Sequence, residues 1–282
     1  MITKVIIPAA GLGTRLLPAT KEQAKEMLPI LAKDSRGRIC LKPFLQLVFE
    51  QLYDFGFREI CFVVGREKRS IEDHFTIDED FMDYLRHKNK TEYLETLSDF
   101  YGKLRNSSVA FYNQPQPLGF AHAVYCAKSF SRDEDFLVHA GDDLVLSKRN
   151  LLQKLVSVFA DHKAEAAFFV QKVKDATKYG VILGNEIEKG IYRVKQIIEK
   201  PPKPPSELAV VAIYCFTPNI YRAIELAKPG LNNEIQLTDA IQTLIGQNKP
   251  VFALELDPQD KRIETGDPLS YKEAFSAKIG ST

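Results

Sequence analysis

The chain begins with a short, uninterrupted apolar run that ends in small residues and glycines. Residues 5–7 are Val-Ile-Ile, and Pro-Ala-Ala-Gly follows at 8–11. Such a run is typical of a strand that is buried on both faces of a parallel sheet. Because glycines permit close backbone approach, the loop after this strand is predicted to bind a ligand.

Helical and strand patterns alternate through the first half of the chain. Residues 45–55 carry apolar side chains at helical spacing up to Gly56, and residues 59–64 form a second apolar run. Strand, helix and strand in this order predict the βαβ unit of a parallel sheet. The other elements expected here are two or three charged amphipathic helices within 70–104, a strand at 109–114, a helix at 119–128 and a buried strand at 135–143.

The second half is richer in strands that follow one another closely. The pattern predicts strands at 165–173, 179–183, 191–199, 208–216 and 251–256, and helices at 151–162, 219–227, 236–245 and 269–277. Short turns between strands predict antiparallel additions to the parallel sheet. The expected fold class is therefore α/β, a Rossmann-like mixed but mostly parallel sheet flanked by helices, in a single domain over residues 1–282.

Composition narrows the functional classes. The 282 residues are 45% hydrophobic and 27% charged, and their net charge is +1. Such a balanced charge gives no field that gathers nucleic acid or an acidic membrane, so the expected partner is a small ligand. The four cysteines show no Cys-x-x-Cys spacing and are expected to be buried free thiols. The chain shows no leader-like or membrane-spanning segment, so a cytoplasmic protein is expected.

The first glycine loop has the composition of a triphosphate site. Gly11-Leu-Gly13 does not continue as a dinucleotide fingerprint, because Leu16 stands where the third glycine would be, and the loop lacks a Gly-Lys-Ser/Thr ending. It offers backbone amides to phosphate oxygens, and cations to the charge that moves during reaction. The polar and basic residues that cluster around it are Thr14, Arg15, Lys21 and Lys25.

Several blocks of sequence match a known family in the right order. Residues 8–21 and 25–29 closely resemble the signature of the sugar-1-phosphate nucleotidylyltransferases, and most of all the prokaryotic UTP–glucose-1-phosphate uridylyltransferases (UDP-glucose pyrophosphorylases). The resemblance continues through Gln114 and residues 119–124, 141–143, 179–181, 198–201 and 233–240. It implies a nucleotide-binding half at about residues 1–145, a sugar-binding half at about 146–282, and a homo-oligomer, either a dimer or a tetramer.

The resemblance also implies a reaction. A sugar phosphate oxygen of glucose 1-phosphate would attack the α-phosphorus of UTP in line, assisted by Mg²⁺, to give UDP-glucose and pyrophosphate. The alternative is the same chemistry with dTTP, because residues 114–117 also resemble the thymidylyltransferase pattern, although Lys21 and residues 25–29 favour the uridylyl branch. A non-catalytic sugar-nucleotide-binding protein is a remote alternative, since Arg15, Lys25 and Asp142 are all retained.

The matching residues inherit roles from this resemblance. The nucleotide is expected to contact Ala10, Gly11, Gly13, Thr14, Gln114 and Gly119, and the sugar phosphate Gly180, Glu199 and Lys200. Arg15 and Lys25 are expected to be catalytic, by stabilising the transition state. From the residues alone, the Gln114 amide suits the edge of a pyrimidine. Glu199 suits sugar hydroxyls and Lys200 the sugar phosphate, in the different directions that neighbouring strand residues supply. His122 is expected to have a packing role.

Two carboxylates are candidates for holding Mg²⁺. Asp142 comes at the end of the strand predicted at 135–143, where α/β sheets bind ligands, and Asp143 is expected to cap a helix or to support Asp142 from behind. The resemblance places a second metal ligand at Glu264, where the family usually has Asp. Glu264 is expected to be that ligand, because its longer side chain can still reach the ion. The alternatives are that Asp267 replaces it, or that the ion rests on Asp142 and phosphates alone. A second departure is Ala-Ile at 212–213, where the family usually has Gly-Arg.

Overall fold

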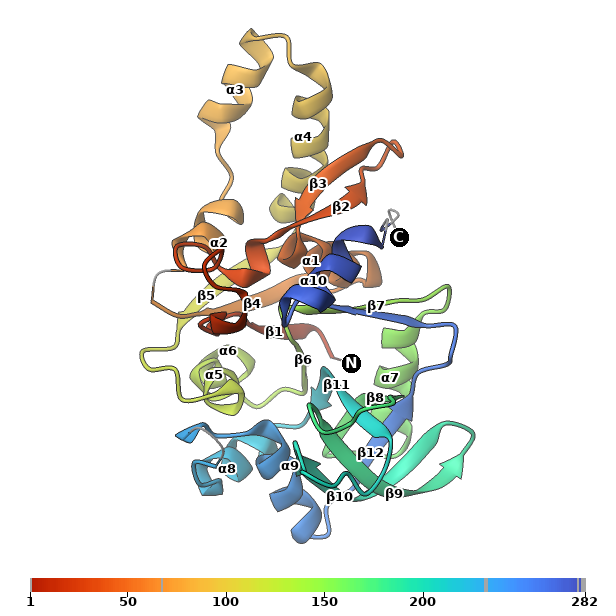
Figure 1. Cartoon of the computed structure of the whole chain (residues 1–282). Coiled ribbons are helices and arrows are strands. Elements are labelled where there is room, and N and C mark those ends of the chain that lie inside the picture. The colour runs from red at the N-terminus through yellow and green to blue at the C-terminus, as the bar shows by residue number, and fades with distance from the viewer. Residues whose placement is uncertain (1, 67, 231–232, 278, 280–282) are drawn as a thin grey trace.

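A nine-stranded mixed sheet forms the centre of the protein (Figure 1). The computed structural model describes residues 2–66, 68–230, 233–277 and 279. Across the sheet the strands run in the order β5 (Ser108–Asn113), β4 (Glu59–Val64), β1 (Lys4–Pro8), β6 (Phe136–His139), β11 (Leu208–Phe216), β8 (Ala166–Lys172), β12 (Val251–Glu255), β10 (Ile191–Glu199) and β9 (Gly180–Glu188). The first four are parallel, and β11 joins them antiparallel to β6. The predicted fold class is confirmed.

Helices cover both faces of the sheet. They are α1 (Phe44–Phe55), α2 (Arg69–His74), α3 (Glu79–His87), α4 (Thr91–Arg105), α5 (Phe120–Cys126), α6 (Lys128–Ser131), α7 (Leu151–Asp161), α8 (Asn219–Leu226), α9 (Leu237–Gly246) and α10 (Pro268–Ser276). Apolar side chains of α1, α4 and α7 belong to one buried cluster, and those of α5, α8 and α9 to another. Within the residues described, no helix has the length and apolar character needed to cross a bilayer.

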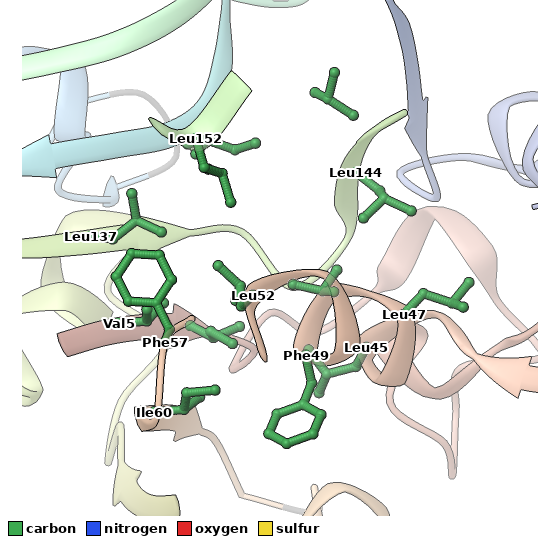
Figure 2. Close-up of a cluster of buried hydrophobic side chains, with 14 of the residues drawn as sticks. Val5, Leu45, Leu47, Phe49, Leu52, Phe57, Ile60, Leu137, Leu144 and Leu152 are labelled. Atoms are coloured by element: carbon green, nitrogen blue, oxygen red, sulfur yellow. The ribbon is translucent and has the colours of Figure 1, made fainter. Parts of the chain in front are cut away.

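Helix α1 shows how the strands are held in place. Helix α1 ends at Gly56, whose φ of 121° is costly for a residue with a side chain. Its apolar face packs against β1, β4, β6, β7 and α7, as Figure 2 shows. The labelled side chains of that cluster are Val5, Leu45, Leu47, Phe49, Leu52, Phe57, Ile60, Leu137, Leu144 and Leu152. This packing fixes α1 against the parallel strands β1, β4 and β6, and the glycine loop follows the first of them.

Two small two-stranded sheets were not expected from the sequence. One pairs β2 (Pro29–Lys33) with β3 (Ile39–Pro43), and the other pairs β7 (Asp143–Leu146) with β13 (Lys261–Glu264). The strand predicted over 135–143 is wrong at its end, because β6 stops at His139 and Asp143 already starts β7. Gly141 lies at this turn, and a side chain there would come within 3.2 Å of Glu26.

Other predicted bounds need smaller corrections. The helix expected at 119–128 is two short helices, α5 and α6, which meet at Ala127. Strand β9 runs on to Glu188, because its outer residues pair with β10 although most of them are exposed. The two or three helices expected within 70–104 are the three helices α2, α3 and α4. Of these, α3 and α4 rise away from the sheet in Figure 1.

A half-buried histidine under α4 makes the fold sensitive to acid. His74 stacks on Phe100 at 5.0 Å between ring centroids and hydrogen-bonds to Gln46 Oε1 at 3.0 Å. Burial lowers the pKa of His74 to about 4. An unfolded histidine titrates near 6.5, so between those values the unfolded chain takes up a proton that folded His74 does not. The contribution of neutral His74 to the free energy of unfolding is therefore fully present above pH 6.5, and it is lost as the pH falls toward 4.

Replacing His74 by Phe should remove that dependence. Between pH 7.5 and pH 5, the free energy of unfolding measured in urea should fall by about 2 kcal/mol more in the wild type than in His74→Phe. This is the value expected from the change in the His74 pKa on folding. Phe keeps the stacking on Phe100 and does not titrate, although it loses the hydrogen bond to Gln46 at both pH values. Equal losses in the two proteins would show that His74 is not the group responsible.

Candidate active site

The glycine loop folds back on itself after β1. Gly13 has a left-handed φ of 67°, and a side chain at that position would come within 3.2 Å of Thr20. Thr20 Oγ1 donates to the Gly13 carbonyl at 2.8 Å, which closes the turn. Gly11, Thr14 and Arg15 remain exposed on this loop. The backbone and the Arg15 charge are therefore available to a ligand.

Lys25 and Asp142 meet although they are far apart in the sequence. The Lys25 ammonium is in direct contact with Asp142 Oδ2 and lies 4.0 Å from Glu26 Oε1. The Lys25 side chain is 16% exposed and that of Asp142 is 24% exposed. Glu26 is buried and pairs with Lys68 at 3.5 Å. The structure thus places Lys25, the predicted catalytic lysine, in contact with Asp142, the predicted metal ligand. The buried Glu26–Lys68 ion pair lies beside them.

The charges of this cluster support one another. Burial opposes ionisation of Asp142, but the charge of Lys25 and its hydrogen bond outweigh it and hold the pKa of Asp142 below its usual value. Burial likewise opposes the charge on Lys25, but Asp142 and Glu26 outweigh it, and the pKa of Lys25 is raised. The Lys25–Asp142 pair is therefore charged at neutral pH, which suits a site that binds phosphates.

Glu264 lies next to this pair through its backbone. It ends β13, and the following amide, that of Thr265, donates to the Asp142 carbonyl at 3.1 Å. Glu264 Oε1 accepts a hydrogen bond from the Tyr179 hydroxyl at 3.3 Å, and Oε2 pairs with Arg262 at 3.1 Å. Burial raises the pKa of Glu264, and Arg262 opposes that rise.

The neighbouring carboxylates are committed elsewhere. The prediction that Asp143 caps a helix is wrong, because Asp143 begins strand β7. Its Oδ2 lies 2.7 Å from Arg262 Nη2. Asp267, the alternative metal ligand, caps α10: its Oδ1 accepts from the amides of Leu269 (3.0 Å) and Ser270 (2.9 Å). Its oxygen thus serves the helix end.

The predicted base contacts form a second group of residues. Gln114 is buried directly after β5, and its Nε2 lies 3.0 Å from both the Gly119 carbonyl and His122 Nδ1. His122 therefore holds the Gln114 amide in place. Gly119 has a φ of 98°, and a side chain there would come within 2.8 Å of the Ile235 carbonyl. The need for glycine at 119 is thus explained by close packing within the chain.

The three predicted sugar-phosphate residues form a third group. Gly180 starts β9 opposite Glu199, and a side chain at 180 would come within 2.8 Å of Thr238 and 3.2 Å of Glu199. Glu199 accepts a hydrogen bond from Thr238 Oγ1 at 3.1 Å and pairs with Lys200 at 2.9 Å. Glu199 and Lys200 therefore do not point in opposite directions, because Lys200 leaves the strand with a φ of 39°.

Contacts that the sequence did not predict link these groups. Tyr179 binds Glu264 through its hydroxyl, and its carbonyl accepts from the Lys200 amide at 3.0 Å. Arg15 lies against Gly266, 3.7 Å from the position that a side chain would occupy. The sequence offers no separate reason to select Arg262, Thr238 or Tyr179 as functional residues. They lie only in or beside the stretches that resemble the family. Arg15 thus lies beside Gly266, two residues after Glu264. Tyr179 joins Glu264 to Lys200, at the end of the site where the sugar phosphate is expected.

The donor set fits a hard divalent cation shared with phosphates. Among the residues described, no three His, Cys, Asp or Glu side chains gather into a metal cage. Asp142 and Glu264 supply carboxylate oxygens from adjacent backbone positions, and both are partly exposed. Mg²⁺ commonly uses one or two carboxylates together with water and substrate phosphates. These two residues therefore suit Mg²⁺ held jointly with a ligand.

Known proteins match almost the whole chain. Residues 4–278 match the nucleotidyl transferase family model. A UTP–glucose-1-phosphate uridylyltransferase of Bacillus subtilis (strain 168) is 39% identical over 275 residues, which cover 96% of this chain and 88% of that protein. Solved structures of UDP-glucose pyrophosphorylase, one apo and one complexed with UDP-glucose, are 34% and 33% identical with TM-scores of 0.87 and 0.83, and each covers 98% of both chains. This chain belongs to the nucleotidyl transferase family.

Proposed function

We propose that this protein transfers UMP from UTP to glucose 1-phosphate and forms UDP-glucose and pyrophosphate. The observation that carries the proposal is the charged Lys25–Asp142 pair beside the glycine loop, linked through Glu264 and Tyr179 to Lys200. Such a chain of contacts suits two phosphate-bearing substrates that must meet. The names of the similar proteins, uridylyltransferase and UDP-glucose pyrophosphorylase, support the same reaction.

The chemistry requires charge neutralisation more than covalent help. The amides of the loop at Ala10, Gly11, Gly13 and Thr14 would bind the triphosphate, and Arg15 and Lys25 would stabilise the charge that develops as pyrophosphate leaves. Lys200 would hold the attacking sugar phosphate, while Glu199 accepts hydrogen bonds from the sugar hydroxyls. Mg²⁺ held by Asp142, with Glu264 as a second ligand, would supply further positive charge to the phosphates.

Release of pyrophosphate tests this proposal directly. Purified protein with Mg²⁺, UTP and glucose 1-phosphate should release pyrophosphate and form UDP-glucose in equal amounts. Omitting glucose 1-phosphate should stop the release, which separates transfer from simple hydrolysis. A protein that binds UDP-glucose but releases no pyrophosphate would instead favour the non-catalytic binding alternative.

Base recognition has its own prediction at Gln114. Because Gln114 is fixed by His122 and Gly119, we propose that its amide reads the pyrimidine edge. Nε2 already contacts Gly119 and His122, so Oε1 is the atom left to accept a hydrogen bond from the base. Gln114→Leu should therefore raise the KM for UTP about 10-fold, the cost of one lost hydrogen bond, with a smaller change in KM for glucose 1-phosphate. Initial rates with varied UTP measure it, and an unchanged KM would exclude the role.

The choice between UTP and dTTP is a separate question. A pocket discriminates one methyl group by only about 1–3 kcal/mol, so a thymidylyltransferase or dual activity is the second candidate. Rates with UTP and dTTP, at equal concentrations and with glucose 1-phosphate held constant, distinguish the two. A kcat/KM for dTTP equal to or above that for UTP would replace the uridylyl assignment.

Assembly and location complete the proposal. We propose a homo-oligomer, either a dimer or a tetramer, which is supported by the exposed apolar side chains of Ile39 (74%) and Leu41 (59%) on β3. Light scattering after size exclusion would give the mass of the particle, and the mass of a monomer would exclude the proposed oligomer.

A cytoplasmic location is proposed because UTP is a metabolite of the cell interior. We also propose a nucleotide-binding half at about residues 1–145 and a sugar-binding half at about 146–282, on the roles proposed for Gln114 and Glu199.

A further inference from the structure

Arg262 is a largely shielded cation where the small β7–β13 sheet meets the main sheet. The antiparallel register of these strands places Glu264 opposite Asp143. Alternate residues of a strand share a face, so Arg262 lies on the same side as Glu264. Only 12% of the Arg262 side chain is exposed. The guanidinium therefore sits among its neighbours rather than in solvent.

This guanidinium holds carboxylates from two strands. Its Nε donates to Asp143 Oδ1 at 3.0 Å, and its Nη2 donates to Asp143 Oδ2 at 2.7 Å, which is a bidentate pair. The same Nη2 lies 3.1 Å from Glu264 Oε2. One cation therefore serves two carboxylates that would otherwise repel each other across the strand pair.

Tyr179 extends the cluster to the sugar end. Its ring lies over the Arg262 guanidinium, 5.0 Å from ring centroid to Cζ, and its hydroxyl donates to Glu264 at 3.3 Å. Its carbonyl accepts the Lys200 amide. A displacement of the guanidinium would therefore move the support on which the backbone of Lys200 rests.

Asp143 extends the cluster to the main sheet. Its Oδ2 accepts from the Ala212 amide of β11 at 3.3 Å, and the neighbouring Asp142 carbonyl accepts from Thr265. The pair of Arg262 with Asp143 thus anchors β13 beside the residue proposed to hold the metal. By contrast, the base contacts at Gln114 rest on His122 and Gly119 and share none of these hydrogen bonds.

We propose that Arg262 is a positioning residue for the sugar-phosphate substrate, acting through Glu264 and Tyr179. The inference rests on the proposed function, since it assigns Lys200 to the sugar phosphate. Arg262 sets the distance between the sugar end and the Lys25–Asp142 pair. Losing it should impair use of glucose 1-phosphate more than binding of UTP, because the base end is held independently.

The test compares Arg262 with an arginine at the other end of the same strand pair. Arg149 follows β7 and pairs with Asp257 and Asp260, which precede β13, but its side chain is 45% exposed. Arg262→Met should lower kcat/KM for glucose 1-phosphate about 10²-fold, the scale expected of a small misplacement. The affinity for UTP measured with a chelator, which leaves out the metal role of Glu264, should change less than about threefold, and Arg149→Met should change neither value.

Further measurements keep the outcome decisive. Arg262→Lys keeps the charge without the bidentate fork, so it should recover part of the loss, and it replaces Arg262→Met if that variant does not fold. UDP-glucose affinity, measured by calorimetry without turnover, should fall in the Arg262 variants and not in Arg149→Met. Equal effects on UTP and glucose 1-phosphate, or an Arg262→Met protein that matches Arg149→Met, would overturn the inference. An inactive wild type would count against the proposed function alone, because the affinities still test Arg262.

Discussion

Asp142→Asn is expected to lower kcat about 10²- to 10³-fold, the cost of losing one group that stabilises charge in a transition state. Asn has the shape of Asp and can still accept a hydrogen bond from Lys25, so the change removes a charge and little volume. UTP binding in the presence of a chelator should survive, because the loop amides and Arg15 are untouched. Pyrophosphate release measured over a range of Mg²⁺ concentrations gives kcat, and calorimetry gives the affinity for UTP.

Asp267→Asn is the matched control for that experiment. Asp267 lies three residues after Glu264, but its oxygen caps α10, and Asn serves as well as Asp at the start of a helix. The control should therefore keep both its stability and its turnover. Near-normal turnover of Asp142→Asn would exclude the metal role of Asp142. An equal loss in Asp267→Asn would favour the alternative metal ligand.

The strands that sequence patterns predicted well are those with a strong local signal. Strands β4, β10 and β11 have the predicted bounds, because each is a long apolar or alternating run. Strands β7 and β13 have only four residues each and pair across more than a hundred positions. Their stability comes from long-range contacts such as Arg262 with Asp143, which no local window contains. That is also why Asp143 was expected at a helix.

The candidate site shows the same division. The glycine loop, Lys25 and Asp142 were predicted because their residue types suit phosphates and metal. Residues that hold others in place, such as His122 for Gln114 and Thr238 for Glu199, become visible only when the chain is folded. The expected divergence of Glu199 and Lys200 was wrong for a related reason, since the positive φ of Lys200 cannot be inferred from strand alternation.

Lys25→Met is expected to affect both turnover and stability. The lysine cation lies between Asp142 and Glu26, and the Lys25 and Asp142 side chains are less than a quarter exposed. Met fills the same volume without charge, so Asp142 is left without its partner, at a cost of about 3 kcal/mol. kcat/KM should fall about 10³-fold, because the same cation is proposed to stabilise the departing pyrophosphate. Urea unfolding and pyrophosphate release measure the two effects.

The double variant separates these two effects. In Lys25→Met with Asp142→Asn no uncompensated charge remains at this pair, since Glu26 still has Lys68. We therefore expect the double variant to recover most of the lost stability and none of the lost activity, which gives a large coupling energy. Lys21→Met, in which a lysine with a 76% exposed side chain is replaced, should stay within about 0.5 kcal/mol of the wild type. If the double variant stayed as unstable as Lys25→Met, packing rather than charge would be the contribution of Lys25 to the fold.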